Sequence, residues 1–475
     1  MSIRRYVANK DNTITNAYQE NLRIRATTSN MGASDILEVF SIYGQASSSS
    51  LEASRILIDF PIADIIQDRN LKKIGLSGSV EFVLKLSNAV HGQSTPSNFD
   101  LVVSPLSSSW EEGYGLDMET YTDIGTSNWI SASSTSGWTN PGGDTLTTEL
   151  KQNFFDGTED LNLDITNLVE NWIDGSIHPN GFLIKLTGSQ ENSNQSFYTK
   201  KFFGRGSEFF FKRPWIEART KDFLKDDRDN FILSSSLLDV ENLNTLILYN
   251  RVNGKLKNIP GIGTGSGLQI SLYAGTDLPQ QPALVLHNGQ AKIDAGFYKT
   301  GIYTASVAVN TTSSYLFDVW FSGSSAESSG SIVYGTGSIA TIKHDLSFDN
   351  ENIQYVVNIK NLKSSYSPGE IGNFRIYARD KNWNPNIYHI ASSYSENIII
   401  NNLYYKIVRI QDNLEVIGYG TGSFEHTKTS SDSEGNYFDL DMSLLERDYS
   451  YCIKLGYFYQ EQFFELQETF KFRVE

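Results

Sequence analysis

The segment "DITNLVENWIDGSIHPNGFLIKL", residues 164–186, predicts a short amphipathic helix followed by a buried strand. Its apolar residues recur at i, i+3, i+4, i+7 and i+8, on one face of a helix: Ile165, Leu168, Val169, Trp172 and Ile173. Asp164 precedes this stripe, where its carboxylate can accept hydrogen bonds from free backbone N–H groups and complement the helix dipole. Gly175 follows it and suits the left-handed end of a helix, and Asn180-Gly181 then turns the chain into the strand "FLIKL".

The same segment raises the question of a catalytic site, because it also contains Asp164, Glu170, Asp174 and His178. The stripe predicts that Glu170 faces away from the packed side of the helix. Because a cap, a helix stop and a core face account for the segment, we interpret it as structural rather than catalytic.

Most of the remaining sequence predicts β-strands. Short alternating runs of apolar, aromatic and β-branched residues are separated by Ser, Gly, Asn, Thr and Asp clusters, as in antiparallel sandwiches. Examples are "SRILIDF" (54–60), "VEFVLKL" (80–86), "FDLVVSPL" (99–106), "GFLIKL" (181–186), "TASVAV" (304–309) and "YLFDVWF" (315–321). Helical periodicity is scarce, so an all-β fold is expected.

Length and charge restrict the class of protein. A chain of 475 residues is too long for one hydrophobic core, and 39 basic against 55 acidic residues give a net charge of −16. This charge disfavours nucleic acid and anionic lipid as partners. The basic aromatic stretch at 200–221 is interpreted as two half-buried strands rather than a nucleic-acid site. The sequence contains no 18-residue apolar run, so no membrane span is expected. No apolar region lies near its start, so no secretory signal is expected.

Known catalytic and metal-binding motifs are absent from the sequence. The single cysteine, Cys452, excludes an internal disulfide, and no histidine has a His or Cys partner at metal-ligand spacing: His91, His178, His287, His344, His389 and His426. No nucleophile elbow, H-E-x-x-H or complete phosphate loop occurs. We therefore expect no enzyme activity, no cofactor and no metal.

The aromatic stretch 107–143 has the composition that most suggests binding. Trp110, Tyr114, Trp129 and Trp138 could stack on sugar rings, with nearby acidic residues accepting hydrogen bonds from hydroxyl groups. The alternative is a long loop whose tryptophans fill the edge of a sandwich core. Both interpretations remain open at this point.

Composition divides the chain into five segments. We predict an N-terminal arm at 1–20, a β-sandwich at 21–220, a charged linker at 221–230 and sandwiches of immunoglobulin-like size at 231–340 and 341–475. A weak repeat links the last two: Gly-Thr-Gly-Ser follows an apolar strand in the stretches that start at Asn253 and Gln411, and "YGTGS" recurs at 334–338. These glycines are expected in turns and bulges.

The segment "NLDITNLVENWIDGSIHPNGFLIKL" resembles the helix-and-strand signature of DNRLRE-type β-sandwich domains. Further pieces agree in order: "NMGASDILEVFS" (30–41), "SRILIDFPIADI" (54–65), "VEFVLKL" (80–86), "SSSWEEG" (107–113) and "KRPWIEAR" (212–219). "SGWTNPGG" keeps Trp138 and Pro141 of the family's tryptophan loop, with different spacing. The resemblance implies a jelly-roll-like sandwich with one short helix and no catalytic residues.

The opening "IRRYVANKDNTITNAY", together with 32–60 and 200–219, further resembles a version of this domain in virion structural proteins of tailed bacteriophages, where immunoglobulin-like regions commonly follow. The resemblance implies a non-enzymatic protein of the head, neck or tail, made in the bacterial cytoplasm and present in several copies among other virion proteins. Arg4, Arg5 and Tyr6 of the predicted arm, and exposed edge strands, are then candidate docking elements. Binding of a host-surface glycan through 107–143 is the alternative function.

Overall fold

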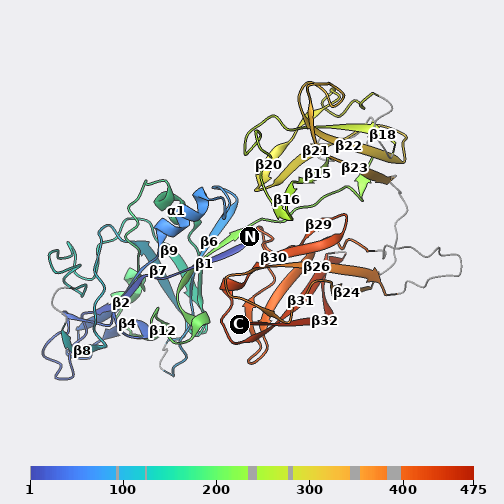
Figure 1. The fold of residues 1–475 in the computed structure, drawn as a ribbon. Helices are drawn as coiled ribbons and strands as arrows, with labels where there is room; N and C mark the ends of the chain where they lie inside the picture. Colours follow the sequence, from blue (N-terminus) through green and yellow to red (C-terminus); the bar gives the residue numbers. More distant parts are fainter. Residues whose placement is uncertain are drawn as a thin grey trace.

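The computed structural model describes residues 2–92, 96–122, 126–233, 243–275, 282–342, 354–381, 397–459 and 461–475, with only the backbone for 119–122. Three bodies built from β-strands follow one another along the chain (Figure 1). The predicted all-β, multi-domain fold is therefore confirmed. The first body is coloured blue to green, the second green to orange-yellow and the third orange to red.

The first sandwich consists of a four-stranded and a nine-stranded sheet. The smaller sheet has the order β1 (Ile3–Val7), β13 (Trp215–Thr220), β6 (Val80–Leu86) and β10 (Leu161–Asp164). The larger follows β8 (Asp117–Thr122), β3 (Ser29–Asn30), β2 (Lys10–Thr15), β5 (Leu51–Asp59), β11 (Phe182–Leu186), β7 (Phe99–Pro105) and β9 (Leu150–Phe154). Off this path, β4 (Ile36–Tyr43) pairs with β5, and β12 (Phe197–Phe203) pairs with β4.

The predicted helix is α2 (Thr166–Ile173), and it closes the core of this sandwich. Leu168, Val169 and Trp172 are buried, and the Trp172 ring lies 4.7 Å from that of Phe182 on β11. Gly175 has a φ of +81°, as the helix stop requires. Two helices were not predicted from the sequence: α1 (Ile62–Asn70) and the single turn α3 (Gly188–Glu191).

The predicted N-terminal arm at 1–20 is wrong, because its residues form β1 and β2, one strand in each sheet of the first sandwich. β1 pairs with β13 from Ile3 to Val7, and β2 pairs with β5 from Lys10 to Thr15. The polar residues of β2 are buried because the interior satisfies them: Asn12 Nδ2 donates to Ser127 Oγ at 2.8 Å, and Thr15 Oγ1 donates to the Ala53 carbonyl at 2.9 Å. A polar strand of this kind resembles a solvated tail in sequence.

The second sandwich packs a five-stranded sheet against a three-stranded one. Their orders are β14 (Phe231–Ile232), β23 (Ile332–Ile342), β22 (Tyr315–Ser322), β18 (Gln269–Ala274) and β19 (Ile293–Asp294), and β15 (Asn244–Tyr249), β21 (Ile302–Val307) and β20 (Gly296–Lys299), with a small ribbon of β16 (Arg251–Val252) and β17 (Lys255–Leu256). The repeat at 334–338 lies inside β23, so it is not a turn. A Cβ at Gly337 would lie 2.3 Å from Arg228 Nη1. A side chain there would clash with this guanidinium, which explains why glycine occupies the position.

The third sandwich consists of a four-stranded and a five-stranded sheet. Their orders are β24 (Tyr355–Ile359), β26 (Ile371–Asp380), β30 (Gly435–Asp441) and β29 (Ser430–Asp432), and β25 (Ser365–Tyr366), β32 (Gln462–Val474), β31 (Ser450–Tyr459), β27 (Leu403–Arg409) and β28 (Leu414–Ile417). Its core also takes in Ile3, Phe211 and Trp215 of the first sandwich, so the two bodies share one apolar cluster.

The predicted linker at 221–230 is an ordered junction between the second and third sandwiches. The Asp226 N–H donates to the Ser431 carbonyl at 2.9 Å, and the Asp227 N–H donates to the Thr245 carbonyl at 2.8 Å. Arg228 then pairs with the fully buried Asp318 of β22. Its charged composition therefore serves contacts between sandwiches rather than exposure to solvent.

The boundary placed at 340 falls near the end of β23, and His344 and His389 lie outside the described residues. In the described ranges, every helix is too short or too polar to cross a membrane.

Candidate functional site

The three residues proposed for docking, Arg4, Arg5 and Tyr6, are engaged inside the protein. Arg4 Nη1 and Tyr6 Oη both donate to Asp68 Oδ2, each at 3.0 Å. Arg5 Nε donates to Glu217 Oε2 at 2.9 Å, and Arg5 Nη2 donates to the Val416 carbonyl of the third sandwich at 2.6 Å. The prediction that these residues form an exposed arm that docks on another protein is therefore wrong, because contacts within the chain hold them, although Arg5 Nη1 has no hydrogen-bond partner among the described residues.

Arg5 belongs to a charged cluster on the outer face of the smaller sheet, which we call the Glu217 cluster: Arg5, Glu81, Lys85, Glu217 and Arg219. Glu217 contacts three cations, with Arg5 and Arg219 at 2.9 Å and Lys85 at 3.3 Å. Arg219 also pairs with Glu81 at 3.1 Å. Although burial alone would raise the pKa of the Glu217 carboxyl, the three cations hold that pKa well below its usual range.

His426 of the third sandwich lies next to this cluster. Burial lowers the pKa of its imidazole to about 4, and the cations Arg219, Lys85 and Arg5 lower it further than the carboxylate of Glu217 raises it. His426 is therefore neutral at pH 7. Gly420 keeps space for the ring, because a Cβ there would lie 2.4 Å from His426 Cε1.

Three of the four aromatic residues proposed for sugar stacking are buried. Trp110, Trp129 and Trp138 are 2%, 8% and 7% exposed and form a satellite core beneath the larger sheet. Trp110 Nε1 donates to the Asn180 carbonyl at 3.0 Å, and Trp138 Nε1 donates to the Asn128 carbonyl at 2.8 Å. The proposed contacts of these three residues with a glycan are therefore wrong, since the tryptophans anchor the loop. Tyr114 is 72% exposed.

The acidic residues of the segment that determines the fold have structural partners. Glu170 Oε1 accepts from Arg69 Nη2 of α1 at 2.7 Å, so it fixes one helix against the other. Asp164 Oδ1 accepts from the Thr166 N–H at 2.9 Å, and Asp174 Oδ1 accepts from the Ser176 N–H at 2.8 Å, one at each end of α2. The interpretation of this segment as structural agrees with these contacts.

Two buried carboxyl groups have strongly raised pKa values. Burial raises the pKa of Asp226 to about 7 despite the nearby Arg228, and the carboxylates of Asp432 and Asp318 raise it further. Burial likewise raises the pKa of Asp11 to about 7, against a backbone hydrogen bond from Arg205. Asp226 lies in the junction between sandwiches, and Asp11 lies on β2. Both carboxyl groups therefore belong to packed contacts within the fold rather than to an open cleft.

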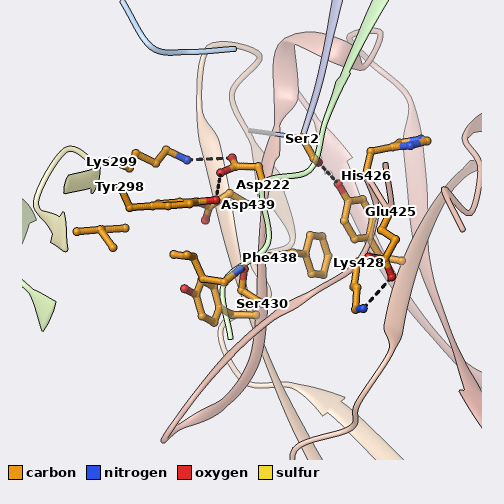
Figure 2. A pocket seen from close by; sticks show the side chains of 14 residues that line it. Ser2, Asp222, Tyr298, Lys299, Glu425, His426, Lys428, Ser430, Phe438 and Asp439 are labelled. Carbon is orange, nitrogen blue, oxygen red and sulfur yellow. Dashed lines mark hydrogen bonds and ion pairs between the residues drawn. The ribbon is translucent and has the colours of Figure 1, made fainter. Parts of the chain in front are cut away.

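The point where the three sandwiches meet is nearly filled by side chains (Figure 2). Ser2 of the first sandwich lies 3.1 Å from Tyr405 Oη of the third. Asp222 Oδ2 accepts a hydrogen bond from Lys299 Nζ at 3.1 Å, and Asp222 Oδ1 accepts one from the Tyr298 hydroxyl at 3.3 Å. Both donors belong to the second sandwich. The remaining cavity of about 50 Å³ has room for a few water molecules only. This point is a joint between domains and is too small for an organic ligand.

Larger clefts flank the first sandwich. One of about 500 Å³ lies between the Glu217 cluster and residues 415–426 of the third sandwich. Another of about 680 Å³ lies between residues 72–79 and β20 of the second. Across the described ranges, no three His, Cys, Asp or Glu side chains are grouped so that they could hold a metal ion. The 500 Å³ cleft is the candidate site, because it combines this volume with a dense group of charges.

Sequence reasoning missed the Glu217 cluster, although its signal is present. Glu81 and Lys85 alternate with apolar residues in "VEFVLKL", and Glu217 and Arg219 do so in "WIEART". Alternation puts these charges on the outer face of the sheet. The charges come together only in the folded sheet, where β13 lies between β1 and β6. There Arg5 pairs with Glu217, and Glu217 pairs with Val83.

No family model and no curated protein matches this chain. Among solved structures, it is similar to the adhesin InvE of Yersinia pseudotuberculosis, with 13% identity over 51% of this chain and 56% of the adhesin and a TM-score of 0.16. It is also similar to α2-macroglobulin of Escherichia coli in its native conformation, with 8% identity over 98% of this chain and 28% of that chain and a TM-score of 0.17. Salmonella α2-macroglobulin is similar with 9% identity over 94% of this chain and 22% of that chain, at a TM-score of 0.15. This chain thus spans well under two thirds of each structure, and TM-scores at this level carry no conclusion about function.

Proposed function

We propose that this chain is a non-enzymatic structural protein of a tailed-phage particle, which links or decorates other virion components through the surfaces of its sandwiches. The observation that carries the proposal is the way in which the sandwiches are joined. The third core includes Ile3 and Trp215 of the first sandwich, and residues 222–228 contact the second and third together. Such joints favour a fixed spacing between surfaces, which a structural component requires.

The chemistry of the described side chains supports this role. Most residues that first suggested catalysis or sugar stacking are engaged as helix ends, ion pairs and buried anchors, whereas Tyr114 and His178 are exposed. Tailed-phage origin itself comes from the sequence resemblance and is part of the proposal.

With Arg4, Arg5 and Tyr6 buried in contacts, another surface must meet the partner. Tyr114 and Leu116 are 72% and 63% exposed on the loop that leads into β8. This loop is fixed from below, because the Gly115 N–H donates to Asn30 Oδ1 at 2.8 Å and the Gly115 carbonyl accepts from the Ala33 N–H at 3.0 Å. Exposed apolar side chains on an ordered loop suit an interface, since little conformational entropy is lost on binding.

Mass spectrometry of purified particles tests this proposal. Phage lacking the gene would be supplied with the wild-type chain, with the double variant Tyr114→Ala/Leu116→Ser, or with Val90→Ser. Val90 is 92% exposed on the same sandwich and is the matched control. We expect a fixed copy number for wild type and control, and roughly tenfold less of the double variant.

Two results would count against the proposal. Absence of the wild-type chain from particles would refute the structural role as a whole. Normal incorporation of the double variant would refute docking through Tyr114 and Leu116 and leave the role in the particle intact. Sugar stacking by the aromatic residues of 107–143 has no part in this role, because three of the four are buried.

A further inference from the structure

The 500 Å³ cleft between the first and third sandwiches has two chemically different walls. One is the Glu217 cluster on the first sandwich, and the other is residues 418–424 of the third, which carry one copy of the Gly-Thr-Gly-Ser repeat. A volume of this size is typical of sites for small molecules. Neither the repeat nor the cleft is needed for the structural role proposed above.

The wall formed by the first sandwich has an excess of positive charge. Its three cations, Arg5, Lys85 and Arg219, face two carboxylates, Glu217 and Glu81. The Arg5 side chain is 10% exposed, and its Nη1 is buried without a hydrogen-bond partner. Burial lowers the pKa of Lys85, the carboxylate of Glu217 opposes this shift, and the neighbouring Arg219 and Arg5 lower the pKa further. Together with Glu415 on the facing wall, the cleft has three cations and three carboxylates, in a chain whose net charge is −16.

The wall formed by the third sandwich offers hydrogen-bond donors. Within the described residues, the backbone N–H groups of Tyr419, Thr421 and Ser423 donate no hydrogen bond, whereas that of Gly420 donates to Thr427 Oγ1 at 2.7 Å. Thr421 and Ser423, which carry hydroxyl groups, also line the cleft. Unpaired backbone donors in an irregular loop can bind oxygen atoms of a ligand.

Acceptors lie at the rim. Glu81 and Glu415 line the cleft, and their side chains are 26% and 55% exposed. A carboxylate at such a position accepts hydrogen bonds from hydroxyl groups but repels a second negative charge. The ligand that satisfies both walls therefore has one acidic group and several hydroxyl groups.

We propose that this cleft binds an acidic saccharide, with its carboxylate at Arg5, Lys85 and Arg219 and its hydroxyl groups at the 418–424 loop and the rim glutamates. Inorganic phosphate satisfies the cationic wall alone and leaves the loop and rim unused. The inference concerns a ligand of the cleft and holds whether or not the chain is part of a particle.

Calorimetric titration of the full chain at low salt tests the ligand class. The acidic probes, each with one carboxylate, are sialyllactose and galacturonate; the controls are lactose, the methyl ester of galacturonate and inorganic phosphate. We expect at least one acidic probe to bind, with roughly tenfold or greater preference over its neutral counterpart and with affinity that falls as salt rises. Binding of phosphate alone, equal binding of acid and ester, or no binding to any acidic probe overturns the proposal.

Variants at one open position place the ligand in this cleft. A Cβ at Gly422 meets nothing within 4 Å, so Gly422→Asp and Gly422→Asn are both accommodated and differ by one charge. We expect Gly422→Asp to weaken binding of the acidic saccharide by roughly tenfold, because the new carboxylate repels it, and Gly422→Asn to bind within a few-fold of wild type. Equal affinities of the two variants would refute this location.

A lysine pair gives an independent check. Lys85→Met removes a cleft cation that pairs with Glu217, and the Lys85 side chain is 30% exposed. Lys201→Met is the control, because Lys201 pairs with Glu38 of β4 at 2.8 Å and its side chain is 25% exposed. We expect only Lys85→Met to lose binding, with unchanged circular dichroism in both variants. Loss in both variants, or in neither, contradicts the cleft as the site.

Discussion

Lys200 shows how a single charged residue can stabilise a β-sandwich from inside. It is 2% exposed, and its Nζ donates to Asn88 Oδ1 at 2.7 Å and to the carbonyls of Gly157 and Glu159 at 3.0 and 2.7 Å. Nζ also lies 4.9 Å from the ring centres of Phe154 and Phe202. Burial lowers the pKa of the ammonium to about 8, against the attraction of Glu159 and Asp160, so it remains largely charged at pH 7.

Substitution of this lysine should destabilise the first sandwich. Lys200→Met keeps most of the volume but leaves two backbone carbonyls and one amide oxygen without their donor, which costs about 2–4 kcal/mol. Lys151→Met is the control, because Lys151 is 55% exposed and pairs with Asp100 at the surface. Denaturant unfolding followed by tryptophan fluorescence measures both; equal stabilities of the two variants would refute the structural role of Lys200.

Asp226 should make stability depend on pH. Its pKa is raised to about 7 in the folded chain, so the folded state holds a proton between pH 4 and 7 that the unfolded state has released. The stabilisation is complete below pH 4 and is lost as the pH rises through 7. Asp226→Asn, which is neutral at every pH, should therefore gain stability relative to wild type between pH 5 and pH 8, by on the order of 1–3 kcal/mol.

Calorimetry at pH 5 and pH 8 checks this sign. His426 acts in the opposite direction, because its lowered pKa gives stability above pH 6.5 that is lost towards pH 4. The difference between variant and wild type at each pH isolates Asp226 from this effect. A difference that stays constant from pH 5 to pH 8 would show that Asp226 is ionised throughout.

At the scale of elements, the sequence predicted well wherever one apolar face decides the structure. The stripe from Ile165 to Ile173 predicted α2, which begins at Thr166 with Ile165 as its N-cap, and "VEFVLKL" predicted β6 with the same bounds, because burial of an apolar face selects one periodicity. Helix α1 was missed since "IADIIQDRN" directly continues the apolar run of β5, and Pro61 separates them only as the first helical turn begins.

Prediction failed where polar residues are buried. β2 has the sequence "KDNTIT", and its Asp11, Asn12, Thr13 and Thr15 are almost fully buried among specific hydrogen-bond partners far away in sequence. For the tryptophans of 107–143 the sequence left sugar stacking and core filling open, and only the fold decides for core filling, where backbone carbonyls accept the N–H groups of Trp110 and Trp138. A local pattern contains no information about such partners.

Removal of the first two strands should unfold the first sandwich. Deletion of residues 2–12 removes β1 from the edge of one sheet and half of β2 from the middle of the other, which exposes apolar core and leaves the backbone groups of β13 and β5 unpaired. We expect an aggregated or partly unfolded product in circular dichroism and size-exclusion chromatography. A folded monomer with an unchanged melting curve would contradict the assignment of these residues to the sheets.

At the scale of the whole molecule, the three sandwiches are connected by more than the chain. Tyr249 and Tyr437 join the second and third through their hydroxyl groups at 3.0 Å, and Lys221 pairs with Glu425 at 3.1 Å. The first and third share an apolar cluster and the Arg5 contact to Val416. These joints support a role that depends on fixed distances between surfaces, and the cleft beside the Glu217 cluster exists only because of them.

Electron cryo-microscopy of purified phage particles tests the central proposal most directly. The account predicts repeated density into which the three sandwiches fit together as one body, in the arrangement of Figure 1, with the first sandwich in contact with another virion protein. Particles without density for this chain, or density in which the sandwiches occupy separate and variable positions, would contradict it.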